Sequence, residues 1–409
     1  MKFLRTASTG RLVASIGGVV AAIAIGAAVA VAAASSGPVP KREPLAKAIH
    51  QALSAKSVSG ITARISFTNN LIPGSELQGS DPLLQGGTGR MWLSSASHAL
   101  RLEIQGSNGD AQVVVHGQRF WAFDPSSNTV YEGTLPSQPS HPRNGWTAYA
   151  PRPSHAPAVP SVAKIQSELS RVMQHAVLSA AIPGDIAGQP AYTVRMSPRR
   201  HGGLLGAIAL GWDAVSGVPL RFSVFARGDT TPVLDLSITN ISYGRVAASS
   251  FSLSPPSGAK VVHLSSASAR PSKHSGSSKS AREVTGVAAV QHALPFKLEA
   301  PVSLAGMKRG EVKLLQMGSH PAALLTYGQG LGGVAVLEAV GSGRSAVPSA
   351  PAGNGAQGLT PPTVSINGTT AQELDTALGS VISFTRNHVA YTVLGSVTPA
   401  VARSAARGL

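Results

Sequence analysis

The stretch of sequence that decides the fold is Leu100-Arg101-Leu102-Glu103-Ile104-Gln105, in which apolar and polar residues alternate strictly. Side chains of a β-strand point alternately to its two faces, so this pattern predicts a strand with one apolar and one wet face. Asn108-Gly109-Asp110 follows and has the turn residues of a β-hairpin. The chain is therefore expected to fold around an antiparallel sheet.

Similar short stretches continue on both sides of this one. Residues 61–68 alternate in the same way. Apolar residues at helical spacing predict two helices, one from Pro44 onward and one between Val162 and Ala176 after a Ser161 cap. The predicted order is helix, several strands, helix, several strands. Further strands are expected at 89–93, 112–115, 119–123, 129–132, 191–196, 207–213, 220–226, 233–243, 312–317, 322–327, 334–340, 381–385 and 389–394.

Composition narrows the class of protein. With 409 residues, two domains are expected, and the hydrophobic content of 43% excludes global disorder. The net charge of +16 favours contact with anionic lipid head groups or cell-wall polymers. Nucleic acid is disfavoured, because the basic residues are scattered and are not interleaved with aromatic ones. Cysteine is absent, which excludes disulfides, a thiol nucleophile and a lipid-modified N-terminal cysteine.

The N-terminus has the pattern of an export signal. Lys2, Arg5 and Arg11 precede the uncharged segment Leu12–Ala34, which at about 1.5 Å per residue is long enough to cross a hydrocarbon layer of roughly 30 Å. We expect a retained signal anchor that makes a single pass through the cell membrane. The alternative is a signal peptide cleaved near Ala34, with secretion of the rest. Both place the bulk of the chain outside the cytoplasm.

Composition shifts along the chain divide it into four parts. Residues 1–42 are the signal anchor or signal peptide, and residues 43–262 form the first exported domain. Residues 263–284 are rich in Ser, Lys, Arg and Pro and are expected to be a basic linker. Residues 285–409 are expected to form a small C-terminal α+β domain that ends in a helix opened by Thr398 and Pro399.

Several motifs between residues 45 and 256 carry a family resemblance. They are Met91-Trp92-Leu93, Gly117-Gln118-Arg119-Phe120-Trp121-Ala122-Phe123-Asp124, Ile186-Ala187-Gly188-Gln189-Pro190-Ala191-Tyr192, Gly217-Val218-Pro219-Leu220-Arg221-Phe222-Ser223-Val224, and the stretch from Phe251 to Lys260. With them the chain resembles the LolA/LolB/RseB lipoprotein-localisation superfamily, and most closely the membrane-anchored LolA-like proteins of actinobacteria.

The resemblance implies an α+β fold in which a curved antiparallel half-barrel sheet encloses helices and leaves an apolar cavity. It implies an envelope protein that holds the acyl chains of a lipoprotein or lipid, as a carrier or a sensor. The alternative is an RseB-like regulatory module that binds a transmembrane anti-sigma factor or another envelope protein. The expected anchor and the second domain depart from the classical soluble carriers.

Strand alternation predicts which residues line the cavity. The alternative is that the same residues fill a dry core. A β-bulge would reverse the face on which some of them lie. The expected cavity residues are Ile65, Phe67, Trp92, Leu102, Val113, Trp121, Tyr192, Trp212, Phe222, Phe225, Leu234 and Leu236.

Motifs of catalysis are missing from the sequence. The stretch Gly328–Gly333 fits GxGxxG, but strand alternation follows it where a dinucleotide fold needs a helix, so we expect a hairpin turn. There is no HExxH and no GxSxG pattern, and Asp110, Asp124 and Asp213 stand at strand ends, where Asp shapes turns. A binding protein without metal or cofactor is expected, and not an enzyme.

The topology can be tested with a reporter that is active only in the cytoplasm, fused after Leu409. We expect it to be silent, because the basic residues precede the apolar segment. Activity of this fusion would contradict export, and the mature N-terminus distinguishes an anchor from a cleaved signal.

Overall fold

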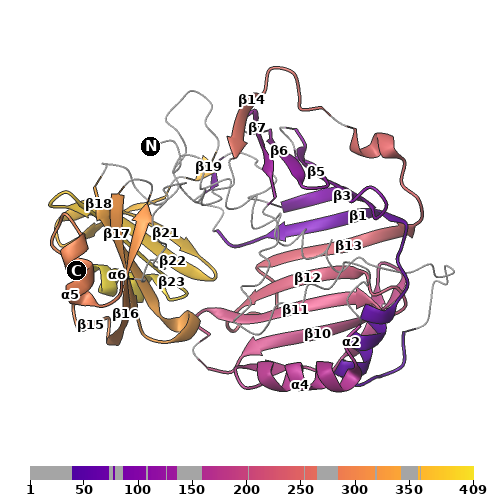
Figure 1. The fold of residues 1–409 in the computed structure, drawn as a ribbon, viewed down its shortest axis with the longest axis horizontal. Coiled ribbons are helices and arrows are strands. Elements are labelled where there is room, and N and C mark those ends of the chain that lie inside the picture. The colour runs from indigo at the N-terminus through magenta and orange to yellow at the C-terminus, as the bar shows by residue number, and fades with distance from the viewer. Residues whose placement is uncertain are drawn as a thin grey trace, which may run out of the picture.

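A computed structural model shows two large β-sheets that are formed by different parts of the chain, and a separate two-stranded pair (Figure 1). The structure describes residues 39–72, 77–78, 86–106, 109–125, 127–135, 159–200, 202–252, 254–264, 284–317, 320–341, 358–359 and 361–409. The segment Leu12–Ala34 lies outside these residues. Among the helices of the described ranges, none is both long and apolar enough to span a membrane.

The first sheet has 13 strands in the order β14-β7-β6-β5-β4-β3-β1-β13-β12-β11-β10-β8, with β9 paired to β10. It joins two meanders, β3 to β7 and β10 to β13, through the antiparallel pair β1–β13. The bounds are β1 Gly60–Asn69, β3 Gly86–Ser94, β4 Ala99–Ile104, β5 Ala111–His116, β6 Arg119–Asp124, β7 Thr129–Thr134, β8 Ala176–Leu178, β9 Ile182–Ile186, β10 Gln189–Pro198, β11 Leu205–Asp213, β12 Pro219–Ala226, β13 Leu234–Tyr243 and β14 Lys260–Leu264.

The expected half-barrel is confirmed as a curled sheet that is antiparallel with one exception (Figure 1). The exception is β14, which pairs with β7 in parallel. Its residues His263 and Leu264 are the first two of the predicted linker, so the ordered sheet reaches further along the chain than the composition indicated.

Two helices lie at the β10 end of this sheet (Figure 1). Helix α2 (Leu45–Ser54) packs its buried Ala48 against the sheet, and helix α4 (Val162–Val172) begins at Ser161, whose Oγ accepts a hydrogen bond from the backbone N–H of Lys164. Both helices were predicted. The apolar face expected to run to Ala176 ends earlier, because that residue belongs to strand β8.

The second sheet has eight antiparallel strands in the order β15-β16-β17-β18-β23-β22-β21-β20. Helix α6 (Pro399–Arg407) buries Ala402, Ala405 and Ala406 on this sheet. The 3₁₀ turn η3 (Gly330–Gly332) joins the antiparallel strands β17 and β18, which confirms the hairpin prediction. The other elements are α5 Val287–Ala293, β15 Ser303–Leu304, β16 Met307–Met317, β17 His320–Tyr327, β18 Val334–Val340, β20 Thr363–Ile366, β21 Thr369–Thr376, β22 Gly379–Arg386 and β23 Val389–Gly395; a separate pair is formed by β2 Leu77–Gln78 and β19 Gly358–Leu359.

Two fully buried carboxylates lie on strands of the second sheet, Glu338 on β18 and Glu373 on β21. Glu373 is paired with Arg403 of helix α6. In Glu338, Oε2 accepts a hydrogen bond from the backbone N–H of Glu299 at 3.0 Å, while Oε1 has no partner among the described residues. Burial raises the pKa of Glu338 to about 7, against the opposing effects of this hydrogen bond and of Arg386.

The buried Glu338 carboxyl predicts a pH-dependent stability. Because its pKa is raised on folding, the free energy of unfolding should fall by about 3 kcal/mol as the pH rises from about 4.5 to above 7. Unfolding by urea, followed by circular dichroism, measures it. Glu338→Gln should remove this fall, and the exposed Glu311→Gln should keep it. An unchanged profile in Glu338→Gln would show that another group titrates.

Candidate functional site

One face of the first sheet is apolar over eight neighbouring strands. The register places Ile65, Met91 and Leu102 on this face of three adjacent strands, and it places Ile65 opposite Ile238. Alternation from these positions assigns the rest of the face. In strands β5, β4, β3, β1, β13, β12, β11 and β10 of the described chain, alternation places no Asp, Glu, Lys or Arg on it. Arg221 borders the pocket described next, but its guanidinium pairs with Asp235, which alternation places on the other face.

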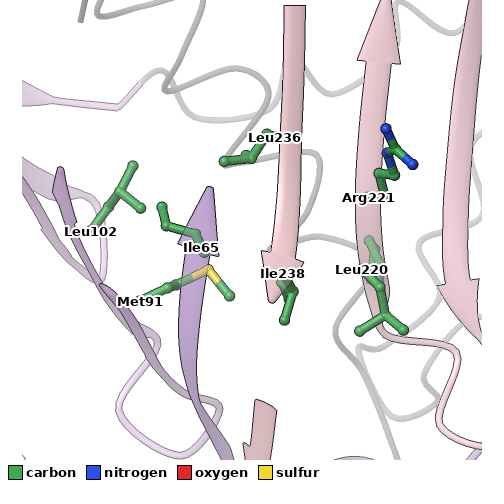
Figure 2. Close-up of a pocket in the computed structure, with 8 residues that line it drawn as sticks. Ile65, Met91, Leu102, Leu220, Arg221, Leu236 and Ile238 are labelled. Atoms are coloured by element: carbon green, nitrogen blue, oxygen red, sulfur yellow. The ribbon is translucent and has the colours of Figure 1, made fainter. Parts of the chain in front are cut away.

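This face is the concave one. Leu102 on β4 and Leu220 on β12 are four strand spacings apart, which is about 19 Å in a flat sheet. They nevertheless line the same small pocket, so the sheet must curl with this face inward (Figure 2). We call it the concave face. The residues that line the pocket are Ile65, Met91, Leu102, Pro219, Leu220, Arg221, Leu236 and Ile238.

The pocket itself is small. Its cavity volume is about 20 Å³, which is room for about one water molecule. Its floor is packed, since Ile65 and Leu220 are almost fully buried. An acyl chain therefore does not fit inside this pocket and could lie only over it, along the open part of the concave face.

An apolar strip crosses strands β1, β13, β12 and β11 next to the pocket. Phe222 lies opposite both Leu210 and Leu236, and Leu236 lies opposite Phe67. Leu210 is 38% exposed, and the other three side chains are half-buried. We call these four residues the groove strip. Exposed apolar side chains on a concave, uncharged surface are the physical requirement for holding an apolar ligand.

Nine of the twelve predicted cavity residues lie on the concave face, in four places. Ile65, Leu102 and Leu236 line the pocket, and Phe67 and Val113 pack against the surrounding core. Phe222 and Leu234 pack further along, in one cluster with Ala377 and Leu378 between strands β21 and β22. The last two, Tyr192 and Trp212, are brought together with ring centroids 6.0 Å apart, but they are buried in the cluster that α2 joins.

The predicted facing was wrong for Trp92, Trp121 and Phe225. Cross-strand pairing places both tryptophans on the opposite face with Arg101, whose guanidinium lies 4.5 Å from the Trp92 ring centroid. Phe225 lies on that face under the guanidinium of Arg195. In these stretches neighbouring residues are all apolar, so alternation could not decide the parity, and cation–π contacts stabilise the rings of Trp92 and Phe225 on the outer side.

Sequence reasoning missed Met91, Leu220 and Ile238, which line the pocket. All three lie in predicted strands. Ile238 could have been found, because it follows Leu234 and Leu236 at the strand period of two. Met91 could not, since its parity is opposite to that of Trp92, and the larger ring was expected to face inward.

Within the described ranges, no group of three or more His, Cys, Asp and Glu side chains could hold a metal ion. Asp213, one of the acids expected to shape a turn, accepts backbone N–H groups of Val215 and Ser216 and the Tyr243 hydroxyl. This is the structural role that was predicted for it.

No family model and no curated protein matches the sequence. Solved structures of similar fold include the complex of MucA and MucB from Pseudomonas aeruginosa, at 15% identity and a TM-score of 0.38, covering 88% of this chain and 94% of that one. Another is an uncharacterised conserved protein from Thermus thermophilus, at 11% identity and a TM-score of 0.31, covering 54% and 97%.

A putative outer membrane lipoprotein-sorting protein domain from Vibrio parahaemolyticus is similar at 9% identity and a TM-score of 0.19, covering 51% of this chain and 96% of that one. All of the TM-scores are below 0.5, and the functional proposals therefore rest on this chain's own residues.

The free energy of unfolding distinguishes residues in the packed floor of the pocket from residues of the half-open groove strip. Leu220→Ala should lower the free energy of unfolding by about 2–5 kcal/mol, because it opens a cavity in a packed core. Leu210→Ala, on the half-open strip, should cost less than about 1 kcal/mol. Equal losses in urea unfolding would mean that the strip is core as well.

Proposed function

We propose that the chain is an envelope binding protein that holds the acyl chains of a lipoprotein or lipid along the concave face, as a carrier or sensor. The observation that supports this most strongly is the groove strip: four apolar side chains, partly open, on a face without charged residues in its described strands. Burying apolar surface yields roughly 25 cal/mol per Å², so such a face binds an alkyl chain without any polar anchor.

We further propose that the protein acts by binding and not by catalysis, and that residues from 43 onward lie outside the cytoplasm. The uncharged segment Leu12–Ala34, with basic residues before it, supports this location. The same segment is proposed to tether the protein to the cell membrane, close to its lipid-bearing ligands.

A second candidate function is an RseB-like regulatory module that binds a transmembrane anti-sigma factor or another envelope protein. The small size of the pocket favours it, because a packed floor leaves a surface to contact and not a cavity to fill. The two functions differ in what the groove strip contacts: an alkyl chain or apolar side chains of a protein.

Binding of acyl chains can be tested by titrating the purified full-length chain with a fluorescent fatty acid or a lipopeptide. Phe222→Asp and Leu210→Asp each place an unpaired carboxylate on the groove strip, so we expect affinity to fall by about 30-fold or more. Val215→Asp introduces the same charge at a side chain that is 51% exposed in the turn after β11, and should bind as the wild type does.

Circular dichroism must show that each variant is folded. Leu210→Asp is the more informative of the two groove variants, because its side chain is already partly in water and folding should survive. Equal binding by all four folded proteins, or binding by none, would remove the acyl-chain proposal and leave the partner-binding module.

A further inference from the structure

The C-terminal domain reaches the concave face of the first domain. Ala377 and Leu378, in the turn between β21 and β22, pack in the same apolar cluster as Phe222 and Leu234, around the buried Val224. By register and alternation, these three first-domain residues lie on the concave face. The turn therefore lies next to Phe222, on the side of the groove strip that faces away from the pocket.

This contact is held in a defined geometry by backbone groups of both domains. The N–H of Ala377 donates to the carbonyl of Leu71 at 2.8 Å, and the N–H of Leu204 donates to the carbonyl of Ser396 at 3.0 Å. The Ser396 hydroxyl also accepts from Leu204 and donates to the Leu378 carbonyl at 2.6 Å. One side chain thus connects the first domain to the turn.

The backbones approach closely at this point. Gly203 has a φ of +60°, and a Cβ there would lie 2.2 Å from the carbonyl oxygen of Ser396. Only glycine has neither a side chain to clash nor a penalty for this backbone conformation. Thr376 stiffens the turn, since its hydroxyl donates to the Gly379 carbonyl and accepts from the Leu378 N–H.

We infer that the β21–β22 turn is the end wall of the groove, and that Leu378 sets the length of the acyl chain that the groove accepts. The inference rests on the proposed function. From Leu220 at the pocket to Val224 beneath the turn, strand β12 advances four residues, or about 13 Å. A chain that runs along β12 from the pocket crosses the groove strip at Phe222 and then meets Leu378.

A fixed end wall gives a measurable dependence on chain length. Each methylene buried adds about fourfold in affinity until the chain reaches the wall. Beyond that length the affinity should stay level. Leu378→Ala removes three carbon atoms, so the plateau should move to chains longer by about three methylenes, and these should bind about tenfold or more tightly than to the wild type. Leu378→Phe should move the plateau to shorter chains.

The experiment is a competition series with saturated fatty acids from octanoate to stearate against a fluorescent fatty acid, on the full-length chain. Val340→Ala is the control. Val340 is 42% exposed and lies at the end of β18 opposite Val389, which is the strand end away from the β21–β22 turn. It should keep the wild-type profile. Thermal unfolding shows whether each variant is folded.

Opposite shifts of the plateau in Leu378→Ala and Leu378→Phe would support the end wall. A plateau that stays at the same length in both folded variants would overturn it and leave acyl binding intact. Absence of binding by the wild type at every chain length would overturn the proposed function, and the end wall with it.

Discussion

The antiparallel pairing of β1 with β13 is the contact on which the rest of the structure depends. Each of the two meanders could form by local hairpins, but only this pair joins strands at distant places in the sequence into one curled sheet. It places Ile65 opposite Ile238 and Phe67 opposite Leu236, so the residues that line the pocket and those of the groove strip meet across it. A shift of one residue here would turn the apolar side chains of one half outward.

The irregularity between Arg64 and Ile65 bears on the same pairing. The register shifts there, so that Arg64 is opposite Asn240 while Ile65 is opposite Ile238. A β-bulge bends a strand and increases its twist, which helps the sheet to curl. The curl brings residues of β4 and β12 together around one pocket. The packed floor of this pocket is a consequence of the curl.

Local pattern predicted much of the fold. Alternation in residues 61–68 and 100–105 identified β1 and β4, and Ser161 was correctly expected as the cap of α4. Three kinds of feature could not be predicted. Strand parity failed where apolar residues are adjacent, as at Trp92 and Trp121. Short edge strands such as β8 and β9 have too few residues for a period, and the contact of Leu378 with the first domain depends on long-range packing.

The central claim is that an acyl chain lies along the concave face of the first sheet. The most direct measurement is residue-level mapping of photo-crosslinks from a fatty acid with a photoreactive group on its chain, bound to the full-length protein. The account predicts crosslinks at Phe67, Leu210, Phe222 and Leu236. Crosslinks concentrated at Trp92 and Trp121, on the opposite face, would contradict it.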